Sequence, residues 1–250
     1  PPQPPPPSSA TPTNCSPGPP TMPIHISPLT PPDIPGATTC IQRAFATDPY
    51  NTWVFSSPTT PFSPARNAAS LALRCTWGIT HALFHIARDP SSPSPAQILG
   101  VACWLPPRDP AAPRSWHEWR GEWWLWLSQV RMNLWFGRGG LNVQRYYVWK
   151  ARQAEAQAAL WNDPKGYYFC NIVTVLPEAQ GRGVGKALFE HVTRRADAEG
   201  RRCYLESSRA EPNMVIYEKM GFRLVKEMVC EEGGEAITLY CMMREPRVDG

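Results

Sequence analysis

The spacing of apolar positions along the chain predicts a series of alternating helices and strands. Where apolar residues recur every three or four positions we expect helices, over residues 31–45, 64–88, 116–135, 142–161, 184–199 and 211–220. Shorter runs rich in β-branched and aromatic residues predict strands over residues 23–29, 98–105, 167–175, 203–207, 222–231 and 236–244. This interleaving predicts an α/β fold with helices packed on a sheet.

The N-terminal segment, residues 1–21, does not follow either pattern. Half of the 30 prolines lie before Gly36, and the segment has almost nothing apolar to bury. Such a composition is typical of a disordered or polyproline II lead. We therefore expect this lead to precede a single domain that covers residues 22–250.

A tryptophan-rich segment lies in the middle of the chain. One helical face is predicted to carry Trp116, Trp119, Trp123, Leu127, Val130 and Leu134. Because Trp124, Trp126 and Trp135 lie off that stripe, we expect a helix buried between the core and a neighbouring element. A lid over an apolar or aromatic substrate and a helix lying on a membrane surface remain open as alternatives.

Composition narrows the functional classes. The net charge of +4 and the pI near 8.7 suit an anionic ligand but not the dense basic face of a nucleic-acid binder. The eight cysteines form no C-x-x-C pair and several lie in apolar strands, so they predict buried thiols in a reducing, cytoplasmic compartment. No apolar run approaches the length of a membrane-spanning helix, and we expect no signal peptide.

A glycine-rich loop joins the strand at residues 167–175 to the helix that follows. Such a junction leaves backbone N–H groups free to bind an anion, most naturally phosphate. A Walker A loop is excluded because Gln180 holds the place of its first glycine and alanine follows Lys186. The dinucleotide fingerprint fits Gly181 and Gly183 but places its third glycine on Lys186. The remaining pattern, Q-x-x-G-x-G, fits Gln180, Gly183 and Gly185, and a glycine-rich turn that binds nothing stays possible.

A second motif lies downstream of that loop. The sequence LESS at residues 205–208 is followed by N-x-x-x-Y-x-x-x-G-F, which comprises Asn213, Tyr217, Gly221 and Phe222. Together the two motifs resemble the GNAT superfamily of N-acetyltransferases. The resemblance is good from residue 167 to 225 and weaker over residues 24–105, and residues 109–163 look like a helical insertion. It implies a mixed, splayed central sheet flanked by helices.

The resemblance also implies where acetyl-CoA, as acyl donor, would bind. The backbones of Val173 and Val175 would pair with the pantetheine arm, and the side chain of Asn213 would hold the arm or the phosphate end of the cofactor. The loop and the helix start would hold the pyrophosphate through Gln180, Gly181, Arg182, Gly183, Val184, Gly185 and Lys186.

For the chemistry, Tyr217 matches the tyrosine that protonates the departing thiolate in this family. An amine acceptor must also lose a proton, and Glu206 is the first candidate for the base, with Asp48 second. No metal site is expected, because His81 and His85 have the spacing of a metalloprotease pair without its glutamate.

The predicted reaction is direct transfer of an acetyl group to a primary amine of a small molecule or peptide in a ternary complex. An O- or longer-chain acyltransferase and a catalytically silent CoA-binding or interaction module remain the alternatives. No nucleic acid and no spanning membrane segment is expected to take part. No pattern in the sequence indicates the acceptor or the oligomeric state.

Overall fold

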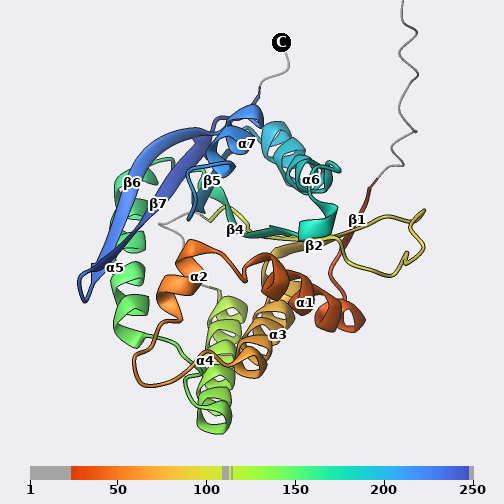
Figure 1. Cartoon of the computed structure of the whole chain (residues 1–250). Helices are drawn as coiled ribbons and strands as arrows, with labels where there is room; N and C mark the ends of the chain where they lie inside the picture. The colour runs from red at the N-terminus through yellow and green to blue at the C-terminus, as the bar shows by residue number, and fades with distance from the viewer. Residues whose placement is uncertain (1–23, 109–112, 114, 248–250) are drawn as a thin grey trace, which may run out of the picture.

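A computed structural model describes residues 24–108, 113 and 115–247 and shows one mixed sheet covered by helices on both faces (Figure 1). The strand order is β1-β2-β3-β4-β5-β7-β6, and only β4 and β5 run parallel. The strands are β1 (His25–Pro28), β2 (Leu83–Arg88), β3 (Gly100–Leu105), β4 (Tyr167–Val175), β5 (Arg202–Ser207), β6 (Arg223–Glu232) and β7 (Glu235–Arg244). The predicted mixed, helix-flanked sheet is confirmed. The predicted disordered lead lies outside the described residues.

The helices divide between the two faces of the sheet. They are α1 (Ile34–Ala44), α2 (Pro49–Val54), α3 (Pro64–His81), α4 (Trp116–Phe136), α5 (Val143–Leu160), α6 (Val184–Ala198) and α7 (Asn213–Lys219), with short 3-10 turns η1 (Pro31–Asp33) and η2 (Pro177–Ala179). In Figure 1, α6 and α7 lie on one side of the sheet and α1 to α5 on the other. The tryptophan-rich segment is helical, as predicted. Its status as an insertion remains a prediction.

Strands β4 and β5 separate before they end. They pair only from Tyr167–Cys170 on β4 to Arg202–Leu205 on β5, whereas β3 pairs with β4 as far as Val175. The last five residues of β4 therefore have one free edge. This is the splay that the family resemblance implied.

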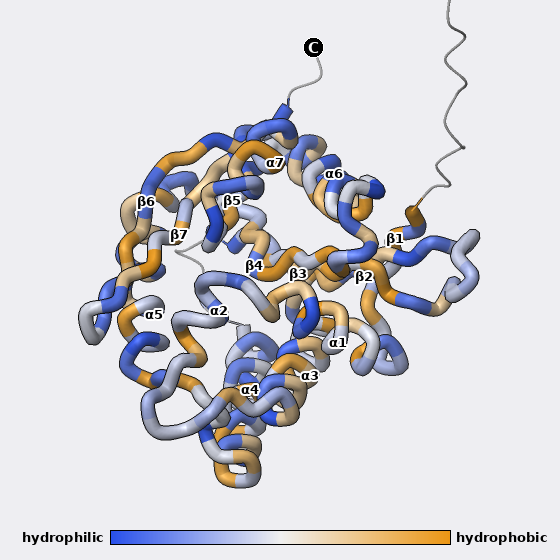
Figure 2. Tube along the Cα trace, viewed as in Figure 1, coloured by the Kyte–Doolittle hydropathy of each residue, from blue (hydrophilic) through white to orange (hydrophobic). Residues whose placement is uncertain are grey.

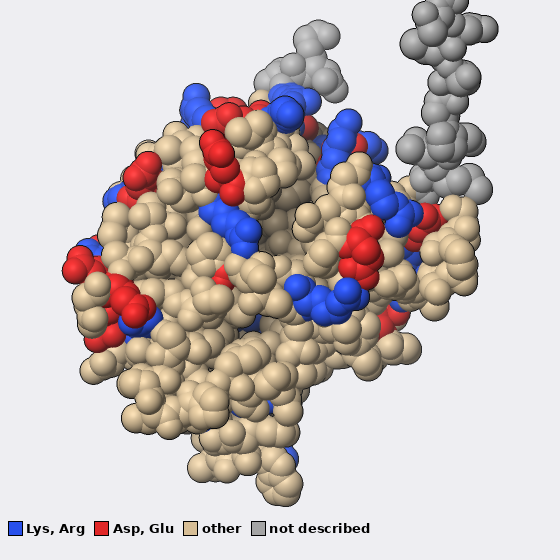
Figure 3. All heavy atoms as spheres, in the orientation of Figure 1, with Lys and Arg blue, Asp and Glu red and all other residues tan. Residues whose placement is uncertain are grey.

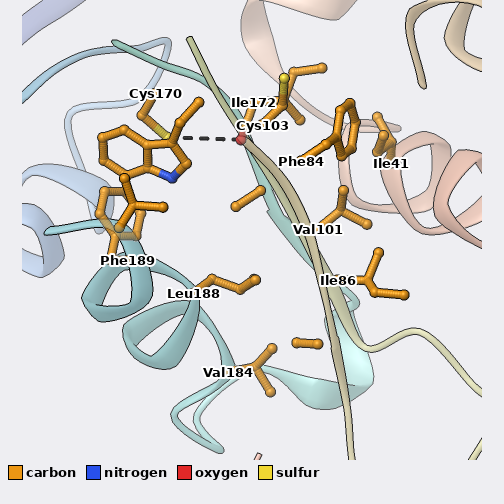
Figure 4. Packing of buried hydrophobic residues seen from close by; sticks show 14 of the residues in the cluster. Ile41, Phe84, Ile86, Val101, Cys103, Cys170, Ile172, Val184, Leu188 and Phe189 are labelled. Carbon is orange, nitrogen blue, oxygen red and sulfur yellow. Dashed lines mark hydrogen bonds between the residues drawn. The ribbon is translucent and has the colours of Figure 1, made fainter. Parts of the chain in front are cut away.

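Helix α6 is held over this splayed region by its apolar face. Val184, Leu188 and Phe189 are all at most 2% exposed and pack toward β3 and β4 (Figure 4). Gly100 of β3 permits the close approach, because a Cβ there would lie 2.8 Å from Val184 Cγ1. Figure 2 shows the hydrophobic course of β3 and β4 through the centre of the molecule. The core thus fixes the first turn of α6 and the loop that precedes it.

One predicted helix was too long. The expected helix over residues 64–88 ends at His81, and residues 83–88 form strand β2 between β1 and β3. Four of the six residues of β2 are buried, in an unbroken run. A strand that is covered on both faces lacks the alternation of apolar and polar residues that distinguishes a strand from a buried helix. The apolar residues of β2 were therefore predicted to continue the helix that precedes them.

The expectation that α4 is buried between the core and a neighbour is wrong for the described chain. Its predicted apolar stripe faces solvent, with Trp116 69% and Leu134 83% exposed. The positions that pack inward are Gly121 and Met132, and α4 lies against α3. Figure 3 shows few charged side chains on the visible surface over α4. The spacing of the apolar residues predicted the helix, but it did not indicate which face of the helix packs against the rest of the protein.

All seven cysteines in the described part of the chain are buried and unpaired, as the sequence predicted for those positions. Among the described residues, no helix has the length and apolar character that crossing a membrane requires. The predicted cytoplasmic location remains a prediction.

Two tryptophans allow a test of this packing. Trp104 of β3 is fully buried against Phe189, whereas Trp135 is 85% exposed. We expect Trp104→Ala to lower the free energy of unfolding by about 3–5 kcal/mol, and Trp135→Ala to change it by less than about 0.5 kcal/mol. Urea denaturation of both variants measures the difference. A loss in Trp135→Ala as large as in Trp104→Ala would show that α4 is covered in solution.

Candidate active site

The free edge of β4 presents backbone groups into the gap beside β5. Leu176 N–H donates to the Leu99 carbonyl on the β3 side at 2.8 Å. Because N–H and C=O groups alternate in direction along a strand, those of Val173 and Val175 face the opposite, unpaired edge. These are the two positions at which the family resemblance implied pairing with the pantetheine arm.

The loop after β4 offers uncapped N–H groups at the start of α6. Gly181 and Gly183 have φ of 76° and 80°, a region that favours glycine, and a Cβ on either would meet nothing within 4 Å. As N-cap residue, Gly183 has no side chain with which to cap the helix. Within the described residues, no protein group accepts a hydrogen bond from the N–H groups of residues 181–183. This end of α6 has room and free donors for an anion.

The predicted charged residues of the loop already have partners. Arg182 forms an ion pair with Asp89, which follows β2. Lys186 Nζ lies 3.6 Å from Glu190 Oε1 and is 70% exposed. Gln180 is exposed and Gly185 packs near Val175, with a Cβ position 3.5 Å from Val175 Cγ2. Binding of an anion at this loop therefore depends more on the backbone N–H groups than on the side chains of Arg182 and Lys186.

Tyr217 of α7 lies on the α6 face, near the point where β4 and β5 separate. Its ring packs against Phe189 with centroids 5.5 Å apart, and also contacts Phe222. Within the described residues its hydroxyl has no hydrogen-bond partner. Burial first, then the nearby Cys170 and Asp48, raise the pKa of Tyr217. The hydroxyl thus remains protonated at neutral pH and can donate a proton or a hydrogen bond.

Asn213, the first residue of α7, is engaged inside the protein. Its Nδ2 donates to Ser207 Oγ at 3.2 Å, and Ser207 Oγ donates to the carbonyl of Arg209 at 2.9 Å. This network holds the turn between β5 and α7. A contact of Asn213 with acetyl-CoA remains a prediction.

Glu206, the first candidate base, lies on the opposite face of the sheet from Tyr217. Its side chain accepts hydrogen bonds from Gln153 Nε2 at 2.8 Å and from Tyr204 OH at 3.1 Å. Burial raises the pKa of Glu206 despite the hydrogen bonds that oppose it. A raised pKa makes this carboxylate a better proton acceptor near neutral pH.

Asp48, the second candidate, serves as a cap. One carboxylate oxygen accepts from Asn51 N–H at 3.0 Å at the start of α2, and the other accepts from Ser208 Oγ. Both oxygens are therefore used to join α2 to the end of β5.

Four polar residues beside Glu206 carried no motif in the sequence. Gln153 and Lys150 come from α5, which lies in the predicted insertion over residues 109–163, and Lys150 Nζ donates to Gln153 Oε1 at 3.4 Å. Arg74 of α3 donates to Asn171 Oδ1 on the splayed part of β4 at 2.7 Å. These residues are far apart in the sequence, and only the packing of α3 and α5 under the sheet brings them together.

His81 and His85 do not share one helix face, because α3 ends at His81 and His85 lies in β2. Within the described residues, no group of three or more His, Cys, Asp or Glu side chains is arranged to hold a metal ion.

Comparison with known proteins agrees with this geometry. Residues 143–224 match the model of the acetyltransferase (GNAT) domain. An uncharacterized N-acetyltransferase of Schizosaccharomyces pombe is 28% identical over 130 residues, which span 50% of this chain and 52% of that protein. The chain thus aligns with only about half the length of that curated relative.

Two solved structures share the fold. One is a histone acetyltransferase HPA2 and related acetyltransferase from Corynebacterium glutamicum, with 21% identity, 90% of this chain and 98% of that chain covered, and a TM-score of 0.53. The other is Arabidopsis thaliana NAA60 in complex with a bisubstrate analogue, with 14% identity, 90% and 99% covered, and a TM-score of 0.51. At these identities the likeness shows the fold.

The environment of Glu206 predicts a measurable titration. Its carboxyl is expected to titrate above the ordinary value of about 4.3, and Gln153→Leu should raise its pKa further, because Gln153 stabilises the charged form. A carbon-13 NMR titration of the side-chain carboxyl groups, assigned with Glu206→Gln, measures both values. A wild-type pKa at or below the ordinary value would contradict this account of the site.

Proposed function

We propose that the protein is an acetyl-CoA-dependent N-acetyltransferase, since residues 143–224 match the model of the acetyltransferase (GNAT) domain. It transfers an acetyl group to the primary amine of a small molecule or peptide, directly in a ternary complex. The observation that carries the proposal is the meeting, at one break in the sheet, of an unpaired β4 edge, an uncapped helix N-terminus and a protonated tyrosine.

The donor site is supported by the chemistry of its groups. The free edge at Val173 and Val175 suits the amides of a pantetheine arm, which can hydrogen-bond to it as a strand would. The N–H groups of residues 181–186 suit a pyrophosphate, and the absence of a Cβ at Gly181 and Gly183 permits close approach of phosphate oxygens. Acetyl-CoA supplies the activated acyl group when bound.

The acceptor amine then approaches from the face that holds Glu206. A free alkylamine is mostly protonated at neutral pH, so a base must take up its proton, and Glu206 serves directly or through water. The new bond joins the amine nitrogen to the acyl carbon, and the bond from that carbon to sulfur breaks. Tyr217 gives its hydroxyl proton to the departing sulfur, and the second proton that the acylated nitrogen loses restores this hydroxyl directly or through water. A backbone N–H near Val173 donates to the acyl oxygen, where charge develops.

Two glycines provide a matched test of donor binding. Gly183 and Gly233, in the β6–β7 turn, both have positive φ and open space where the methyl group of an alanine would lie. Replacing either by alanine should therefore cost a similar amount of stability, about 1–2 kcal/mol. Only Gly183→Ala should weaken acetyl-CoA binding, by about tenfold or more, equal to 1.4 kcal/mol.

Calorimetric titration with acetyl-CoA measures the affinity of each variant, and thermal unfolding measures the stability. Equal affinity in both variants would remove the loop from the donor site. No binding of acetyl-CoA to the wild-type protein at millimolar concentration would overturn the proposed function.

The two proton carriers can be tested separately. Tyr217→Phe should lower kcat by about 10²-fold or more while acetyl-CoA affinity is kept, because only the proton is removed. Glu206→Gln should lower kcat and remove an acid limb from the pH dependence of kcat/KM, since activity rises as the carboxyl loses its proton. Release of CoA over a panel of amines and alcohols gives these values. Unchanged turnover in Tyr217→Phe would contradict its role as acid, and activity on alcohols alone would favour an O-acyltransferase.

A further inference from the structure

Arg74 is a half-buried cation without a carboxylate partner. Its guanidinium donates to Asn171 Oδ1 at 2.7 Å, and within the described residues this is its only hydrogen bond. By contrast, Arg244 is buried with two hydrogen bonds to Asp197, and Arg145 is buried beside Glu232 and Glu235. Partly buried charges are normally paired, so the remaining donors of Arg74 are suited to a ligand.

Arg66 of α3 also lacks a carboxylate, but its surroundings differ. It donates to Asn133 of α4, and a Cβ at Gly139 would lie 2.9 Å from its Cδ. The α3–α4 contact and the Gly139 loop therefore enclose it. Arg74, in contrast, is joined to the part of β4 that has no β5 partner.

A second cation lies in the same region. Lys150 of α5 is close enough to Arg74 and Glu206 for their charges to act on its pKa, which burial and Arg74 lower. Lys150 reaches Glu206 through Gln153, which hydrogen-bonds to both. Asn171, which holds Arg74, directly follows the last residue of β4 that pairs with β5, and Glu206 directly follows its partner on β5. Elements α3, α5 and β4 therefore converge beside the proposed base.

Arg74 and Lys150 lie near Glu206 but form no ion pair with a carboxylate among the described residues. The oxygens of Glu206 and of the nearby Asp48 are engaged by other hydrogen-bond donors. Two cations without a paired carboxylate favour an acceptor that carries an anion and disfavour one with a second cation.

We propose that the acceptor is an amine that also carries a carboxylate, which Arg74 binds with support from Lys150 while the amine faces Glu206. This inference rests on the proposed function and names its substrate class. Guanidinium groups match carboxylates in geometry and can bind them through two parallel hydrogen bonds. Arg74 is then a specificity-determining residue of the acceptor side, contributed by a helix in which the sequence shows no motif.

Matched acceptors test the inference directly. In the small-molecule pair, 4-aminobutanoate is compared with butylamine; in the peptide pair, a peptide with an N-terminal aspartate is compared with the same peptide with asparagine. We expect the kcat/KM of the carboxylate member to be at least about tenfold higher in one pair or both, the effect of one charge-assisted hydrogen bond. The pair that shows the preference tells whether the carboxylate belongs to a small molecule or a peptide.

The variant Arg74→Met should remove that preference. Its KM for the carboxylate acceptor should rise about tenfold or more, while kcat, the KM for acetyl-CoA and the activity on butylamine stay near those of the wild type. Arg74→Lys should recover part of the preference because it keeps the charge without the fork. Arg152→Met serves as control, because Arg152 lies on α5 near Lys150 but is exposed and paired with Glu155.

The outcomes separate this inference from the proposed function. The inference is overturned if wild-type protein acetylates the acceptors without the carboxylate with the same kcat/KM as those that carry it. It is also overturned if the protein binds acetyl-CoA but acetylates none of the four acceptors. The same holds if Arg74→Met keeps the preference. Failure to bind acetyl-CoA at all would instead overturn the proposed function. Thermal unfolding of Arg74→Met distinguishes a lost ligand contact from a lost fold.

Discussion

The incomplete pairing of β4 with β5 is the constraint on which the rest of the structure depends. Four residues of each strand pair, and beyond Cys170 and Leu205 the two strands separate. Backbone groups without partners are costly when they are buried, so this edge must remain open to solvent or be met by a ligand. The glycine loop, Tyr217 and Glu206 all lie around the point where the two strands separate. The role proposed for each of them depends on this position.

Packing on the two faces holds this gap in shape. On one face, Val184 and Leu188 fasten the start of α6 to β3, where Gly100 leaves room, so the free N–H groups stay beside β4. On the other face, α5 lies along β6 and brings Gln153 to Glu206. The sheet therefore separates the proposed donor side from the proposed acceptor side, and the two meet where β4 and β5 part.

Most helices and strands could be predicted, because their periodicity reflects burial on one side. The errors fall where burial is not one-sided. Residues 83–88 are covered on both faces and so carried no alternation, and α4 presents its apolar stripe to solvent with Gly121 and Met132 turned inward. A hydrophobic pattern indicates that a face is apolar. It does not indicate what covers that face, which depends on neighbours distant in the chain.

The sequence by itself determined the motifs of the proposed donor side, because the spacing of Gln180, Gly183 and Gly185 and the N-x-x-x-Y motif ending at Tyr217 are local features contained within a few residues. The positive φ of Gly183 and the free helix start follow from such local chemistry. Only the tertiary structure brought together the residues of the proposed acceptor side. Arg74, Lys150 and Asn171 come from three separate elements, and their shared position beside Glu206 arises from long-range packing, which no local pattern records.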